Sequence, residues 1–120
     1  PASGACSRMI QMIGIGRLKQ MIMAVETVDA AEAYRIGLVG SVCAPEVLMD
    51  EALAYARRLL TKAPQAMGMA KHIINACQNV DTETGRLLER LGQSVLIRTD
   101  DNKEGMTAFQ EKRPTRFQGR

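Results

Sequence analysis

Apolar residues recur at helical spacing through most of the chain, and this pattern constrains the fold more than any other feature. The clearest stripe lies between Ala66 and Cys77, where apolar side chains follow the i, i+3, i+4, i+7 rule of an amphipathic helix. Comparable stripes predict further helices over residues 3–13, 17–25, 45–62 and 82–97. The sequence therefore predicts a mostly α fold of six or seven helices with short connectors.

Local signals mark where several of these helices begin and end. Ser3 is a candidate cap for the first helix, and the pair Gly14 and Gly16 predicts a hinge before the second. Asp29 and Glu32 resemble a capping box for a short helix over residues 30–36. Gly37 then fits the C′ position that ends such a helix.

One run of the sequence is typical of a strand. Residues 38–43, Leu-Val-Gly-Ser-Val-Cys, are rich in β-branched side chains and short. A single short strand is not stable by itself, so we expect this run to add an edge to a sheet that lies elsewhere. The fold would then contain at most one or two short strands.

The stretch from Thr99 to Arg113 is predicted to be a well-delimited terminal helix, with Thr99 as its cap and Pro114 as its stop. Phe109 shares a face with Arg113, four residues on, and Lys112 borders that face. A ring beside cations suits a ligand that carries a flat ring and phosphates. Spacing alone favours the plainer alternative, in which Phe109 is buried and the charges are solvated.

Composition excludes several classes of protein. A net charge of +3 is too weak to indicate nucleic-acid binding, and the basic residues 112–120 are typical of a solvated tail, although they could meet phosphates. The three cysteines form no CxxC and predict neither a disulfide framework nor a metal site, which suits a reducing compartment such as the cytoplasm. No apolar run is long enough to predict a membrane span.

The residues offer little catalytic chemistry. His72 is the only histidine, lies one position off an apolar stripe and is expected to be half-exposed. The serines lack the context of an activated nucleophile. The sequence thus predicts no catalytic residue.

Four segments, in order, resemble the enoyl-CoA hydratase/isomerase (crotonase) family. They are PASGACSRMIQMIG, VDAAEAYRIGLVGSVCAPEVLMDEALAYARRL, APQAMGMAKHIIN and the stretch that ends EGMTAFQEKRP. Each segment is weakly specific, whereas the ordered set, which covers nearly all 120 residues, is highly specific. Ala2 and Ala5 replace glycines of the family pattern, which leaves the branch of the family open.

The resemblance implies a fold, a partner and a site. Residues 1–44 would be the end of a spiral of ββα turns, and residues 45–120 the helical C-terminal region that builds trimers or hexamers. The oxyanion hole and catalytic glutamates of the family lie upstream of Pro1. Phe109 and Lys112 match the positions that contact the adenine and phosphate end of coenzyme A on a neighbouring subunit. The substrate would be a coenzyme A thioester, with no tightly bound cofactor.

Two functional hypotheses follow. In the first, the chain is part of an enzyme that hydrates an enoyl-CoA or shifts its double bond through an oxyanion-stabilised enolate, and these 120 residues alone are inactive. In the alternative, the chain is a stand-alone helical oligomerisation or binding module, with its Met-rich stripes buried in a dimer or trimer.

Overall fold

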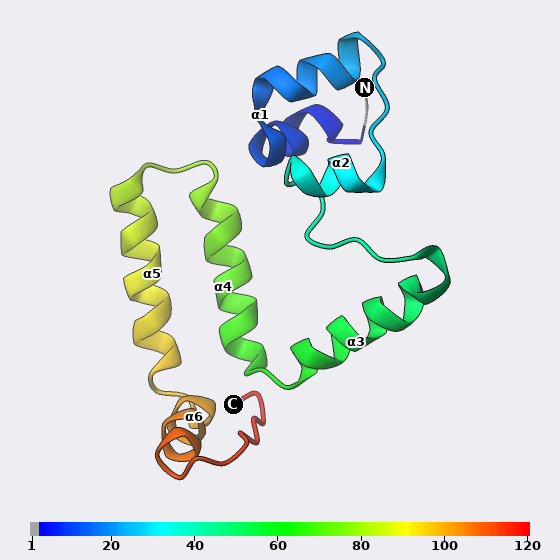
Figure 1. The fold of residues 1–120 in the computed structure, drawn as a ribbon. Coiled ribbons are helices and arrows are strands. Elements are labelled where there is room, and N and C mark those ends of the chain that lie inside the picture. The colour runs from blue at the N-terminus through cyan, green and yellow to red at the C-terminus, as the bar shows by residue number, and fades with distance from the viewer. Residues whose placement is uncertain (1–2) are drawn as a thin grey trace. The chain divides into compact units, whose positions relative to one another are not determined.

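The computed structural model describes residues 3–120 and is entirely helical over that range, apart from turns and connectors (Figure 1). The chain divides into two compact units, and the boundary falls between Leu48 and Met49. We call them the N-terminal unit and the C-terminal unit. None of the described helices is long and apolar enough to cross a membrane.

The N-terminal unit is built from α1 (Ala5–Met23) and α2 (Ala30–Arg35). Gly14 interrupts α1 with φ 76° and ψ 161°, so the predicted glycine hinge is confirmed as a kink. The prediction that Ser3 caps the first helix is wrong. The cap is Gly4, in a left-handed conformation, and no side chain bonds to the free N–H groups there.

Charged side chains join α1 to α2. Glu32 pairs with Arg17 of α1 and with Arg35 one turn further along its own helix. Asp29 caps α2, and its carboxylate accepts a hydrogen bond from the Glu32 backbone N–H at 2.8 Å. Only one half of the predicted capping box therefore forms, because the Glu32 carboxylate is engaged by the two arginines.

The strand predicted over residues 38–43 does not form, and residues 3–120 contain no strand at all. The backbone N–H groups of Leu38 and Val39 turn back to the Ala33 carbonyl, at 2.9 and 3.3 Å, and so close the end of α2. A strand needs a neighbour to pair with its backbone, and the described residues supply none.

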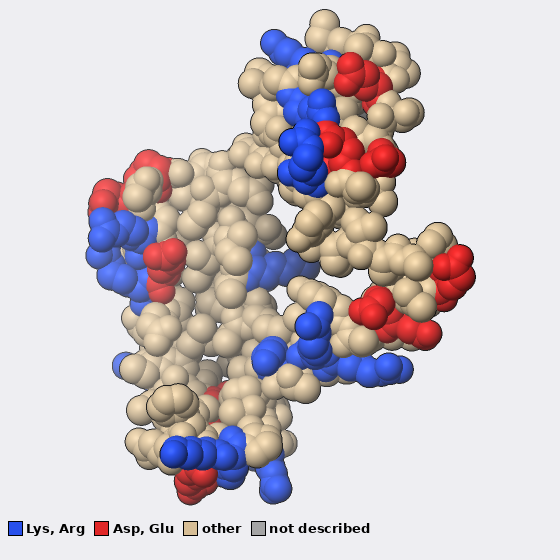
Figure 2. Space-filling view, viewed as in Figure 1, with Lys and Arg blue, Asp and Glu red and all other residues tan. Residues whose placement is uncertain are grey.

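The C-terminal unit contains most of the helices. Near the end of the N-terminal unit, Pro45–Val47 forms a 3-10 turn that leads into α3 (Leu48–Leu60). The helices α4 (Pro64–Cys77), α5 (Thr82–Leu96) and α6 (Asp100–Gln110) follow. Acidic residues lie in the first turn of α3 and arginines in its last turn, which suits the helix dipole and is visible in Figure 2.

The helices α4 and α5 form an antiparallel pair (Figure 1), and glycines set their spacing. A Cβ atom at Gly92 would lie 2.7 Å from Ile73 Cδ1, and one at Gly85 would lie 3.1 Å from Cys77 Sγ. Both glycines are buried, whereas three larger apolar residues of the same helix, Leu87, Leu91 and Val95, are about half exposed. The contact face of α5 is thus built around small residues, which allow the two backbones to approach closely.

Candidate functional site at the end of α6

The first turn of α6 forms as the sequence predicts. The Thr99 hydroxyl accepts a hydrogen bond from the Asn102 N–H at 3.1 Å and donates one to the Leu96 carbonyl at 2.7 Å. This double contact caps α6 and ties it to the end of α5. The first turn of α6 is therefore fixed by hydrogen bonds between the Thr99 side chain and the backbone.

The last turn of α6 closes with Lys112 in a left-handed conformation at φ 54°. The Arg113 N–H bonds to the Ala108 carbonyl at 3.0 Å, and the Lys112 N–H bonds to the Phe109 carbonyl at 3.3 Å. This pair of bonds is the Schellman motif, whose C′ position usually holds glycine. Lys112 and Arg113 were predicted to lie in the last helical turn, but α6 ends at Gln110 and both residues follow it.

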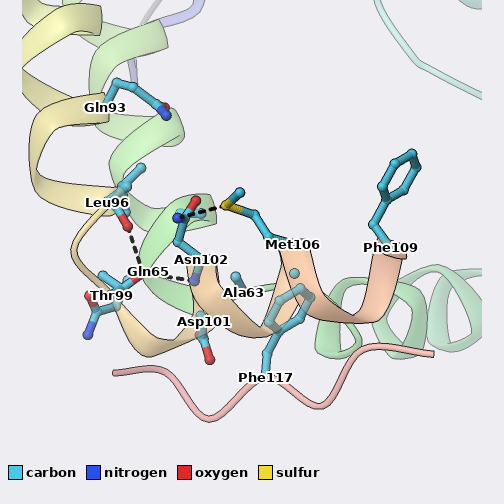
Figure 3. Close-up of a pocket in the computed structure, with 12 residues that line it drawn as sticks. Ala63, Gln65, Gln93, Leu96, Thr99, Asp101, Asn102, Met106, Phe109 and Phe117 are labelled. Atoms are coloured by element: carbon cyan, nitrogen blue, oxygen red, sulfur yellow. Dashed lines mark hydrogen bonds between the residues drawn. The ribbon is translucent and has the colours of Figure 1, made fainter. Parts of the chain in front are cut away.

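Phe109 is exposed, and the interpretation that spacing alone favoured, a buried ring, is wrong. Its exposed fraction is 85%, and that of Met106 on the preceding turn is 60%. Figure 3 shows the Phe109 ring projecting away from the other labelled side chains. An aromatic ring that is exposed to water contributes little to the stability of the fold. An exposed ring of this kind is therefore suited to contact a ligand or a partner.

Lys112 lies three residues after Phe109 and is also exposed. Among the described residues, no carboxylate forms an ion pair with its ammonium group. The structure therefore places an exposed ring and an exposed cation at the same end of α6, joined by the short turn between them.

Arg113 is engaged by acidic side chains. Its guanidinium binds Glu104 through two hydrogen bonds of 2.6 and 2.9 Å and binds Glu111 through a third of 2.6 Å. The bond from Arg113 lowers the pKa of Glu104 to about 2, and Glu104 in turn raises the pKa of Arg113. The alternative in which the charges of this helix are solvated does not hold for Arg113, because most of its N–H donors bind Glu104 and Glu111.

The C-terminal segment is bound to α6 through its backbone, while its basic side chains Lys112, Arg116 and Arg120 remain exposed, as expected of a solvated tail. The Asp101 carboxylate, 3% exposed, accepts hydrogen bonds from the N–H groups of Gln118 at 2.6 Å and Gly119 at 2.9 Å. Glu104 accepts another from the Arg116 N–H at 2.8 Å. Sequence reasoning missed both acceptors. Their only signal was two carboxylates three residues apart on one helix face, followed by a basic segment.

An open groove of about 480 Å³ lies beside α6 within the C-terminal unit (Figure 3). Its walls come from the start of α4, the end of α5, α6 and the C-terminal segment, with Leu96, Met106, Phe109 and Phe117 as the larger apolar side chains. Lys112 does not line the groove. Phe109 belongs to both the groove and the exposed end of the helix.

Charged side chains of both signs lie around α6. Figure 2 shows Lys and Arg side chains gathered over that end of the C-terminal unit, beside a few acidic ones. His72, which was expected to be half-exposed, is exposed. Across residues 3–120 there is no cluster of three or more metal-binding side chains.

The sequence profile of the enoyl-CoA hydratase/isomerase family matches residues 1–120. The chain belongs to this family. It is 36% identical over 117 residues to a crotonyl-CoA hydratase of Syntrophomonas wolfei, covering 98% of this chain and 45% of that protein. It is also 36% identical to a short-chain-enoyl-CoA hydratase of Clostridium acetobutylicum, covering 94% of this chain and 43% of that protein.

Solved structures agree with this assignment. The crystal structure of an enoyl-CoA hydratase from Bacillus anthracis superimposes with a TM-score of 0.96 at 33% identity, covering all of this chain and 46% of that one. The chain thus spans less than half the length of the relatives it matches. The mostly helical architecture corresponds to the helical C-terminal part of the crotonase fold, as the sequence predicted.

Proposed function

We propose that this chain is part of an enzyme that processes acyl-CoA thioesters, by hydrating a 2-enoyl-CoA or by shifting its double bond. Its relatives include a crotonyl-CoA hydratase and a short-chain-enoyl-CoA hydratase, which supports a short enoyl-CoA as the first substrate to test. In the family, backbone N–H groups that precede this segment stabilise the thioester enolate. These 120 residues would not catalyse the reaction alone.

Within that enzyme, Phe109 and Lys112 would hold the nucleotide end of coenzyme A on a neighbouring subunit. The observation that carries this proposal is the pairing of a ring that is 85% exposed with an exposed ammonium group three residues later, at the same end of α6. A ring face can stack on adenine, and an ammonium group is a compact charge for phosphate. This role requires an oligomer, which the family resemblance predicts to be a trimer or hexamer.

The experiment measures the dissociation constant of coenzyme A for the product of the complete gene and for F109A and K112A. We expect each variant to weaken binding by about tenfold, the effect of one stacked base or one charge-assisted hydrogen bond. K103A is the matched control, because Lys103 is an exposed lysine of the same helix that pairs with Asp100 at 2.9 Å. Unchanged affinity in both F109A and K112A, with the oligomer intact, would contradict the proposal.

A further inference from the structure

The two residues that flank Lys112, Glu111 and Arg113, both form hydrogen bonds within the chain. Arg113, directly after it, is held by its N–H on the Ala108 carbonyl and by its guanidinium on Glu104. Glu111, directly before it, receives the Arg113 Nε–H at 2.6 Å. The turn that carries Lys112 is therefore clamped on both sides, while its own side chain stays exposed.

Glu104 is the centre of this clamp. Its two oxygens accept two hydrogen bonds from Arg113, and one of them also accepts the Arg116 N–H. Its side chain is only 22% exposed, and Arg113 lies nine positions further along the chain, so the contact ties the end of α6 back to the middle of the same helix. A bidentate Arg–carboxylate pair fixes direction as well as distance.

The left-handed turn needs such support. A lysine in this conformation is less stable than glycine by about 1 kcal/mol or more, so the unclamped turn would readily adopt other backbone conformations. Each alternative conformation would send the ammonium group in a different direction. A cation that recognises one phosphate of a bound ligand loses affinity in proportion to the time spent in those conformations.

We infer that Glu104 is a positioning residue, which acts through Arg113 to hold the Lys112 ammonium group in the direction of the coenzyme A phosphates. This inference rests on the proposed function of Lys112. Glu104 touches no ligand in this scheme, and Arg113 serves as the link between the carboxylate and the turn.

Asp101 offers a matched control on the same helix. It is also an acceptor for the C-terminal segment, but its contacts reach Gln118 and Gly119 rather than the turn at Lys112. Loss of either carboxylate should loosen the C-terminal segment. Only loss of Glu104 should release the turn.

The test compares E104A, D101N, K112A and the double variant E104A/K112A in the product of the complete gene. The readouts are kcat and KM for crotonyl-CoA and for the crotonyl thioester of pantetheine, which lacks the nucleotide. We expect E104A to raise KM for crotonyl-CoA by about threefold to fivefold, as the correctly directed fraction falls, with kcat unchanged. KM for the pantetheine thioester should not change, and the double variant should match K112A.

Three results would count against the inference. If D101N raised the KM for crotonyl-CoA as much as E104A, the effect of E104A would reflect a general loss of structure. Full additivity of the two KM changes in the double variant would point to the same conclusion. An effective K112A beside a silent E104A would overturn the positioning role alone. A silent K112A would overturn the proposed function of Lys112 and the inference with it. If E104A does not fold, the isosteric E104Q takes its place, and the same outcomes apply.

Discussion

The ends of α2 and α6 have the same backbone and different residues at its most demanding position. Each closes with a Schellman pair of hydrogen bonds, from Gly37 and Leu38 to the carbonyls of Tyr34 and Ala33 in α2, and from Lys112 and Arg113 in α6. The left-handed residue has φ 77° at Gly37 and φ 54° at Lys112. Glycine takes this conformation without strain, whereas lysine does not.

The cap of α2 serves only to end the helix, whereas the cap of α6 also presents a charged side chain. A Cβ atom at Gly37 would meet nothing closer than the Met12 carbonyl oxygen, at 4.0 Å, so glycine is present for its backbone and not for space. At Lys112 the chain accepts the conformational cost and surrounds the turn with ion pairs from Arg113 to Glu104 and Glu111. Strain retained in this way points to a use for the side chain.

Strain alone would not support that conclusion. Val25 is also left-handed, at φ 56°, and it is 80% exposed. Nothing in the structure explains a β-branched residue there. Lys112 differs from Val25 in having the Phe109 ring beside it and ion pairs around its turn.

Moving lysine into the α2 cap should give the largest change in stability. We expect G37K to lower the free energy of unfolding by about 1–2 kcal/mol, because the left-handed conformation is costly for a residue with a Cβ atom. G37A, measured beside it by urea denaturation, separates the cost of the Cβ atom from any effect of the charge. Equal stability of G37K and the parent chain would remove the basis of the comparison.

Replacing Val25 tests whether the left-handed conformation at this position costs stability. V25G should raise the free energy of unfolding by about 1 kcal/mol, since the relief of strain exceeds the added entropy of the unfolded chain. The urea midpoint of V25A should stay close to that of the parent in the same experiment, because alanine keeps a Cβ atom. A less stable V25G would show that the left-handed conformation at Val25 is not costly.

The exchange at Lys112 should give a smaller gain. K112G should raise the free energy of unfolding by up to about 1 kcal/mol, since glycine relaxes the turn but adds entropy to the unfolded chain. K112A keeps the Cβ atom and should leave stability nearly unchanged. Thermal unfolding of the two variants in parallel would show whether the α6 cap bears the strain assigned to it.

A further stability test concerns acid. The folded-state pKa of Glu104 is about 2, below its ordinary value of 4.5, because Arg113 and the Arg116 N–H bind the charged form. A depressed pKa stabilises the fold above pH 4.5, and this contribution is lost as the pH falls from about 4.5 towards 2. The difference in urea midpoint between the parent chain and E104Q should thus be constant between about pH 8 and pH 6 and shrink near pH 3. A difference that does not vary with pH would contradict the ion pair.

Features encoded by neighbouring residues could be predicted from the sequence. The Thr99 and Asp29 caps, the glycine kink in α1 and the glycine end of α2 depend on contacts within a few positions, and all of them form. Helical spacing favoured a buried Phe109, whereas the family resemblance made Phe109 a candidate for ligand contact.

Features that depend on distant residues were missed. The burial of Asp101 and the commitment of Arg113 to Glu104 follow from a C-terminal segment that folds back on α6, and no local period encodes that return. The strand predicted over residues 38–43 does not form for a related reason. β-Propensity reflects packing against a neighbouring strand, and the described residues provide no such strand.

If lysine occupies the α6 cap for its ammonium group, then removing that group should weaken substrate binding whether or not the backbone relaxes. KM for crotonyl-CoA would be measured for K112G, K112A and the parent in the product of the complete gene. We expect both variants to raise KM by about tenfold, although K112G relaxes the backbone and K112A does not. A K112G enzyme with the KM of the parent would contradict the claim and reduce the Lys112 turn to a strained end of a helix.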